Sequence, residues 1–154
     1  LYLACQNRHT AVVAKLIQQG ANVNTLVASV GTPLSVAATR GSDEILQLLL
    51  DARATVNITN ERGETPLHLA TRFGHANAVK LLLDRGAVPN VRDVDGVTAT
   101  AVAVLRHQHQ ILLSLLAAKA DARLGDNYGC TPLDLAISMG DVTAVSLLNA
   151  VIQQ

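Results

Sequence analysis

The chain has 154 residues, of which 49% are hydrophobic, 16% are charged and 2% are aromatic. The 12 basic and 12 acidic side chains cancel, so no overall charge draws the chain to nucleic acid or to an anionic membrane surface. No apolar run reaches the roughly 18 residues that a membrane-spanning helix needs. We therefore expect neither nucleic acid nor a membrane as partner.

The tripeptide Thr-Pro-Leu recurs along the chain with a constant spacing. It stands at 32–34, 65–67 and 131–133, with a degenerate copy, Thr98-Ala99-Thr100, between the last two. The period of 33 residues predicts a solenoid, in which similar units stack and bury a continuous core. We treat the whole chain, 1–154, as one domain of five repeats, which span 1–24 (truncated), 25–57, 58–90, 91–123 and 124–154.

Each repeat is expected to contain a short helix, a tight turn, a longer helix and an extended loop. Thr before Pro suits a helix start, because the Thr side chain accepts hydrogen bonds from free backbone N–H groups and Pro is tolerated in the first turn. In the second helix, apolar residues at i, i+3 and i+4 form a stripe that only a neighbouring repeat can bury. The most regular position of this stripe holds Leu16, Leu49, Leu82, Leu115 and Leu148.

The best-preserved copy of the repeat contains Gly63-Glu64-Thr65-Pro66-Leu67-His68-Leu69-Ala70. Its T-P-L-H-x-A pattern resembles the ankyrin repeat, and the resemblance covers essentially the whole chain. It implies an all-α solenoid of stacked helix-turn-helix units with β-hairpin-like finger loops, and a protein-binding module rather than an enzyme. In this family the Thr and the His of the motif brace each other, so we expect His68 to be structural and not a catalytic base.

Repeat four departs furthest from this pattern. Ala99, Thr100 and Ala101 replace its Pro, Leu and His, and His107 replaces the glycine of the turn between the helices. We expect its junction with repeat three to open more easily than the others, because the stability of an array sums over repeats and their interfaces. Leu1 aligns with the third residue of a motif whose first two residues are missing, so we expect the chain to be a segment of a longer protein.

Motifs for metal binding and catalysis are poorly matched. The run His107-Gln108-His109 offers two ligands where a zinc site needs three or four, and neither Cys5 nor Cys130 has a suitable spacing. We therefore expect no metal site, no cofactor and no catalytic activity. Two cysteines also cannot form a disulfide framework, which favours an intracellular, cytoplasmic location.

The resemblance places partner contacts on a concave face, at the exposed ends of the first helices and at the finger tips. Tyr, Phe, Met and Arg are enriched at protein interfaces. The candidate partner-binding residues at these positions are Arg40, Arg62, Arg72, Phe73, Arg106, Tyr128 and Met139. Arg40, Arg72 and Arg106 are expected to form a row of guanidinium groups. Alternatively, they pair with the acidic residues of the neighbouring fingers, which are Glu61, Glu64, Asp93, Asp95 and Asp126.

The expected function is therefore a scaffold that binds another protein or an extended peptide with acidic and apolar residues, and that acts as a monomer. An alternative makes the array a regulatory appendage of a larger enzyme or channel, whose active domain lies outside these residues. Anion binding along the arginines is disfavoured by the zero net charge and the acidic fingers. Self-association through the ends of the array is a further alternative, which sedimentation at two concentrations would expose.

Overall fold

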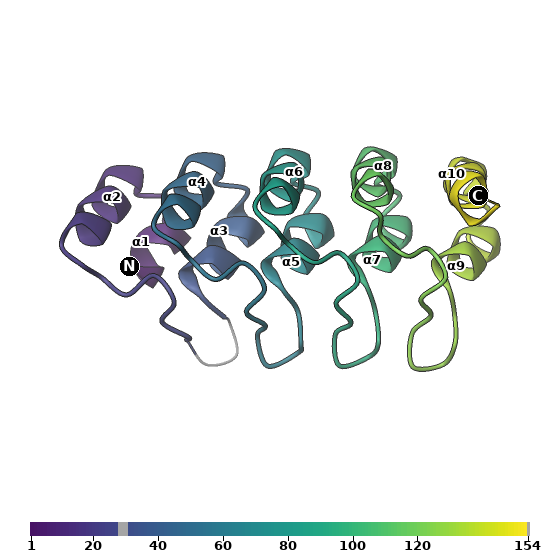
Figure 1. Ribbon diagram of the computed structural model, residues 1–154, viewed down its shortest axis with the longest axis horizontal. Helices are drawn as coiled ribbons and strands as arrows, with labels where there is room; N and C mark the ends of the chain where they lie inside the picture. Colours follow the sequence, from purple (N-terminus) through teal and green to yellow (C-terminus); the bar gives the residue numbers. More distant parts are fainter. Residues whose placement is uncertain (28–30, 154) are drawn as a thin grey trace.

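A computed structural model describes residues 1–27 and 31–153 of the chain. This described part contains ten helices, which follow one another as five pairs in a row (Figure 1). The pairs are α1 (Tyr2–Gln6) and α2 (Thr10–Gln18), α3 (Pro33–Arg40) and α4 (Asp43–Asp51), α5 (Pro66–Arg72) and α6 (Ala76–Asp84), α7 (Ala99–Leu105) and α8 (His109–Ala117), and α9 (Pro132–Ser138) and α10 (Val142–Ile152).

The helices form two layers. The first helices of the pairs, α1, α3, α5, α7 and α9, pack on one another in one layer, and the second helices pack on one another in the other. The connecting loops project from the array as a row of fingers (Figure 1). This arrangement confirms the prediction of an all-α solenoid, and each of the five ranges assigned to a repeat holds one helix pair.

The first helices begin as the Thr-Pro pattern predicts. Thr32, Thr65, Thr98 and Thr131 each precede a first helix, and each side chain accepts a hydrogen bond from the backbone N–H three residues later. In repeat three, the Thr65 N–H also donates to Nδ1 of His68 (3.2 Å), and Nε2 of the same ring donates to the Val97 carbonyl (3.1 Å). His68 therefore ties its own helix start to the next finger, which confirms its structural role.

The second helices supply most of the core. Leu49, Leu82, Leu115 and Leu148 are fully buried at the predicted stripe position, while Leu16 in the first repeat is partly buried. A residue with positive φ follows the second helices of repeats one to four: Gly20, Arg53, Gly86 and Lys119. The two non-glycine residues adopt φ of 62° and 60°, in the left-handed region that disfavours L side chains.

The fingers are turns closed by one recurring polar side chain. The side-chain oxygens of Asn60, Asp93 and Asp126 each accept hydrogen bonds from the N–H groups two and four residues later. Repeat two has Val27 at this position, which has no side-chain acceptor. In all four fingers the N–H of this residue donates to the carbonyl four residues later, and in repeat two the Gly31 N–H also donates back to Val27, which gives an isolated antiparallel bridge. The finger loops are therefore hairpin-like, although the described residues contain no longer strand.

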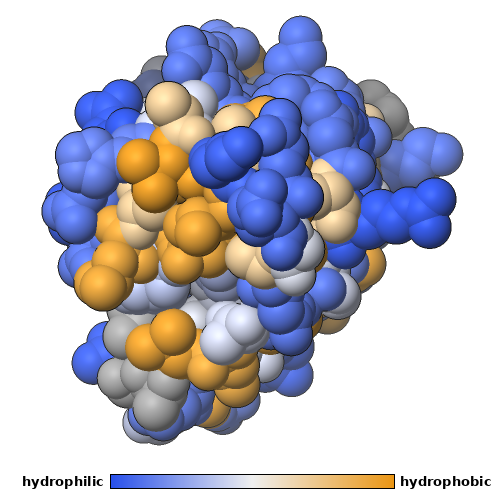
Figure 2. All heavy atoms as spheres, turned by 90° about the vertical axis from the view of Figure 1, so that its left-hand side faces the viewer, coloured by the Kyte–Doolittle hydropathy of each residue, from blue (hydrophilic) through white to orange (hydrophobic). Residues whose placement is uncertain are grey.

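The outward face of repeat one carries an apolar patch that is surrounded by polar side chains (Figure 2). Leu1, Leu3, Val12 and Leu16 line a shallow hollow there, on the side where a further repeat would stack. Within residues 1–27 and 31–153, no helix has both the length and the apolar character that crossing a membrane requires.

Candidate partner-binding surface

The last residue before each turn between the paired helices defines one row of exposed side chains, which we call the helix-end row. In repeats two to five this position holds Arg40, Phe73, Arg106 and Met139, and all four are exposed. Their helices α3, α5, α7 and α9 are successive neighbours, so equivalent side chains recur at about 8–10 Å along the array. Four of the seven candidate residues thus occupy equivalent positions.

The tips of the fingers define a second row, the fingertip row. Arg62, Asp95 and Tyr128 occupy equivalent positions in repeats three, four and five, and all three are exposed. Adjacent tips are joined through the backbone, because the carbonyls of Arg62 and Asp95 accept from the N–H groups of Val94 and Asn127, both at 3.0 Å. Backbone hydrogen bonds therefore hold adjacent fingertips together, and the side chains of the fingertip row are exposed.

Arg72 lies one position before the helix-end row and behaves differently from Arg40 and Arg106. Its guanidinium forms an ion pair with Glu64, whose side chain is only 3% exposed at the base of the same finger. The pairing alternative is therefore confirmed for Arg72, which links helix α5 to its own finger. Within the described residues, Arg40, Arg62 and Arg106 make no ion pair.

The acidic residues expected to flank the arginines are also divided by the structure. Asp93 and Asp126 use their carboxylates to close the finger turns, as described above, and Glu64 is paired with Arg72. Glu61 and Asp95 are exposed on the fingers. The surface therefore carries fewer available acidic groups than the sequence suggests.

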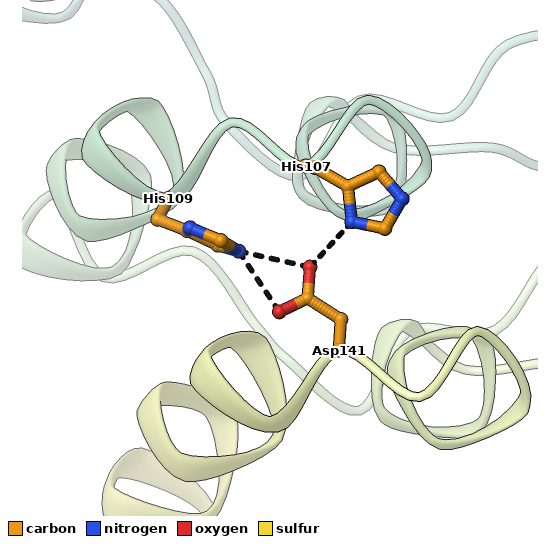
Figure 3. A group of neighbouring side chains, drawn as sticks. All are labelled: His107, His109 and Asp141. Atoms are coloured by element: carbon orange, nitrogen blue, oxygen red, sulfur yellow. Dashed lines mark hydrogen bonds and ion pairs between the residues drawn. The ribbon is translucent and has the colours of Figure 1, made fainter.

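One cluster of side chains was missed in the sequence. Asp141, immediately before α10, accepts hydrogen bonds from Nδ1 of His107 (2.8 Å to Oδ2) and from Nε2 of His109 (2.8 Å to Oδ2 and 2.9 Å to Oδ1) (Figure 3). Its Oδ1 also accepts from the Ala144 N–H. The Ala144 N–H, followed by the two histidines, holds the pKa of the Asp141 carboxyl well below its usual range.

The 33-residue register contains a signal for this cluster. Residue 141 lies one period after residue 108, so it stacks over the turn that holds both histidines. The same stacking occurs two repeats earlier, where Nε2 of His75 donates to the Thr39 carbonyl at 3.0 Å. The run His107-Gln108-His109 taken by itself does not reveal Asp141, because Asp141 belongs to the next repeat.

The fold and surface are those of a stacked helical-repeat protein that presents loops and helix ends along one side. A family model described as ankyrin repeats (3 copies) matches residues 1–93, which is more than half of the chain. The chain therefore belongs to the ankyrin repeat family, whose members generally act as protein–protein interaction modules. No curated protein matches the chain.

Proposed function

We propose that this chain binds another protein or an extended peptide through the helix-end row and the fingertip row. The observation that carries this proposal is the exposure of two aromatic side chains, one in each row. Tyr128 is 94% exposed and Phe73 is 53% exposed, and they are two of only three aromatic residues in the chain. Aromatic residues of this kind commonly supply the anchors of an interface.

The chemistry of the two rows indicates the kind of partner. Arg40, Arg62 and Arg106 carry guanidinium groups without an ion pair among the described residues, and a carboxylate of a partner would supply one. Phe73 and Met139 alternate with the arginines along the helix-end row. A segment with alternating acidic and apolar side chains complements this pattern, and an extended one would follow the array from repeat to repeat.

The test is affinity capture with the wild-type chain beside a Phe73→Ala/Tyr128→Ala variant. Both substitutions remove exposed rings, so circular dichroism should show the same fold. A matched control, Leu113→Ala, removes an exposed apolar side chain from α8 in the layer of second helices. We avoid substitution of Arg72, because it would leave the buried Glu64 carboxylate unpaired.

We expect a protein retained by the wild type and by the Leu113 variant to be lost, or weakened at least about tenfold, with the double variant. Equal retention by all three chains would contradict the assignment of the surface. Capture of no protein by the wild type would instead favour the alternative function, a regulatory part of a larger enzyme or channel whose contacts are made within that protein.

A further inference from the structure

We propose that His107, His109 and Asp141 form a binding site for a divalent first-row transition-metal ion, with Zn²⁺ as the representative ion, that joins repeat four to repeat five. His107 lies in the turn before α8, and His109 is the first residue of α8. Asp141 lies immediately before α10 (Figure 3). None of the three residues belongs to the helix-end row or the fingertip row, although His107 directly follows Arg106 of the helix-end row. The proposal does not rest on the partner-binding surface.

The geometry brings three ligand atoms around one small volume. Nδ1 of His107, Nε2 of His109 and a carboxylate oxygen of Asp141 all lie within 4.8 Å of one another. Zinc bonds of about 2.0–2.2 Å in a tetrahedral site place neighbouring ligand atoms about 3.3 Å apart. Both nitrogens now lie 2.8 Å from Oδ2 of Asp141, so an ion requires each to withdraw from it by about half an ångström. The two nitrogens, which lie within 4.8 Å of each other, must also move closer together. The partly exposed imidazoles can make this movement by side-chain rotation.

Binding of the ion would change which nitrogen of each imidazole carries the proton. At present each imidazole points an N–H at the Asp141 carboxylate, and the ion would take the place of these two hydrogens. Each neutral ring would then carry its single proton on its other nitrogen, Nε2 of His107 and Nδ1 of His109. Oδ1 of Asp141 can keep its hydrogen bond from the Ala144 N–H (3.0 Å) while Oδ2 binds the ion, so helix α10 retains its N-cap.

The backbone at His107 adopts a conformation that disfavours L side chains. Its φ is 54°, in the left-handed region, at the position where repeats two, three and five have Gly41, Gly74 and Gly140. A histidine costs more than a glycine in this conformation, and its side chain is 54% exposed, so core packing does not compensate for that cost. Arg8 occupies the same position in repeat one with a φ of 59°, so the conformation alone does not indicate a ligand. What distinguishes His107 is the contact of its Nδ1 with Oδ2 of Asp141 at 2.8 Å.

The donor set indicates the class of ion. Two imidazole nitrogens and one carboxylate oxygen suit Zn²⁺, Co²⁺, Ni²⁺ or Cu²⁺, whereas Ca²⁺ and Mg²⁺ favour all-oxygen sites. Three protein ligands leave a fourth position, which water can fill. The exposed fractions of the His107 and His109 side chains, 54% and 39%, give the ion a path from solvent.

The first experiment is calorimetric titration of chelator-treated protein with Zn²⁺, and a parallel titration with Co²⁺ followed by visible absorption. The site is disrupted by His107→Gly/His109→Ala, which installs the residues that repeat three has at these positions, Gly74 and Ala76. Glycine relieves the backbone at 107, but the Asp141 carboxylate, only 4% exposed, loses two of its partners and keeps the Ala144 N–H. Circular dichroism and a urea midpoint must therefore show that this variant is folded before its affinity is compared. The matched control is His9→Gln, which removes an exposed histidine from the opposite end of the array.

We expect the wild type and the His9 variant to bind one Zn²⁺ per chain, with Co²⁺ absorption typical of a nitrogen and oxygen site. The double variant should bind at least about 100-fold more weakly, because even groups that only support a metal ligand are worth about 10–100-fold. Absence of wild-type binding would overturn the proposal. Unchanged affinity in the double variant would do the same, because the ion would then lie elsewhere.

A second measurement tests the link between repeats. An ion that binds only the folded chain raises its stability, and ligands from α8 and α10 should slow hydrogen exchange in both helices. We expect Zn²⁺ to raise the unfolding midpoint of the wild type and of the His9 variant but not of the double variant. An equal shift in all three would contradict the site.

Discussion

Repeats three and four build the same first helix from different residues. Helices α5 and α7 are both seven residues long, and both begin at a Thr that caps the first turn. Where repeat three buries Leu67, repeat four buries Thr100, and each is 1% exposed. The Thr100 hydroxyl has no hydrogen-bond partner within the described residues. His68 makes two bracing contacts, whereas Ala101 at the equivalent position has no polar side chain.

The difference shows how much of the repeat the neighbouring repeats determine. A Thr cap and stacked neighbours suffice to form helix α7, even though Pro, Leu and His are all absent. What repeat four lacks is stabilising free energy, because a buried hydroxyl without a partner and a smaller side chain both weaken packing. We therefore expect repeat three to be the more stable unit, and the following predictions test that comparison.

The largest effect is expected when repeat three receives the residue of repeat four. Leu67→Thr removes apolar volume from a fully packed site and buries an unpaired hydroxyl. The free energy of unfolding should fall by about 2–5 kcal/mol. Urea denaturation followed by circular dichroism measures this loss.

The matched control for Leu67→Thr is Leu113→Thr, the same change at an exposed position of α8. It should cost no more than about 1 kcal/mol, since a surface substitution adds little beyond helix propensity. Similar losses of unfolding free energy at the two positions would mean that the burial of Leu67 does not make repeat three more stable than repeat four.

A smaller effect is expected for His68→Ala, which again imitates repeat four. The change removes the donor to the Val97 carbonyl and the acceptor for the Thr65 N–H. Because two backbone groups lose their partners, we expect a loss of about 1–3 kcal/mol in unfolding free energy. The corresponding change in repeat five, Asp134→Ala, lies at an exposed position and should cost less. The reverse order would show that the contact with the next finger is not the source of stability.

The roles of these residues differ in how far the sequence could reveal them. The 33-residue period predicted the stacked helices, because an apolar stripe such as that of Leu82 requires a neighbour to cover it. The Thr65-His68 brace was expected from the resemblance to the ankyrin repeat, in which this pair is typical. The pairing of Arg72 with Glu64, and the approach of Asp141 to the two histidines, depend on side-chain directions between elements. Those directions are set by packing, which a linear pattern does not contain.

His68 also makes the stability of the folded chain depend on pH. Burial lowers the pKa of His68 below its ordinary value of about 6.5, against the opposing effect of the Val97 carbonyl. As the pH falls below about 6.5, the unfolded chain takes up a proton at this residue before the folded chain does, so the folded state loses stability. The loss should stop once the pH passes below the folded pKa.

The contribution of His68 is isolated by comparing urea midpoints of the wild type and His68→Gln between neutral and mildly acidic pH. The wild type should lose more stability on acidification than the variant. Identical slopes would show that His68 does not remain neutral in the folded chain while the unfolded chain protonates.

The smallest effect on stability is expected from a substitution that restores the missing proline of repeat four. Ala99→Pro restores the Thr-Pro start at a residue whose N–H makes no hydrogen bond within the described residues, and Thr98 has φ of −96° and ψ of 164°, as a residue before Pro prefers. A reduced entropy of the unfolded chain should raise stability by about 0.4–1 kcal/mol, and hydrogen exchange in α7 should slow.

The control is Ala76→Pro at the first residue of α6, where the N–H donates to the Gly74 carbonyl at 3.1 Å. That change should destabilise the chain. If Ala99→Pro also destabilises it, the site in repeat four cannot hold the ring that Pro33, Pro66 and Pro132 fit into theirs, and its packing differs in more than the lost side chains.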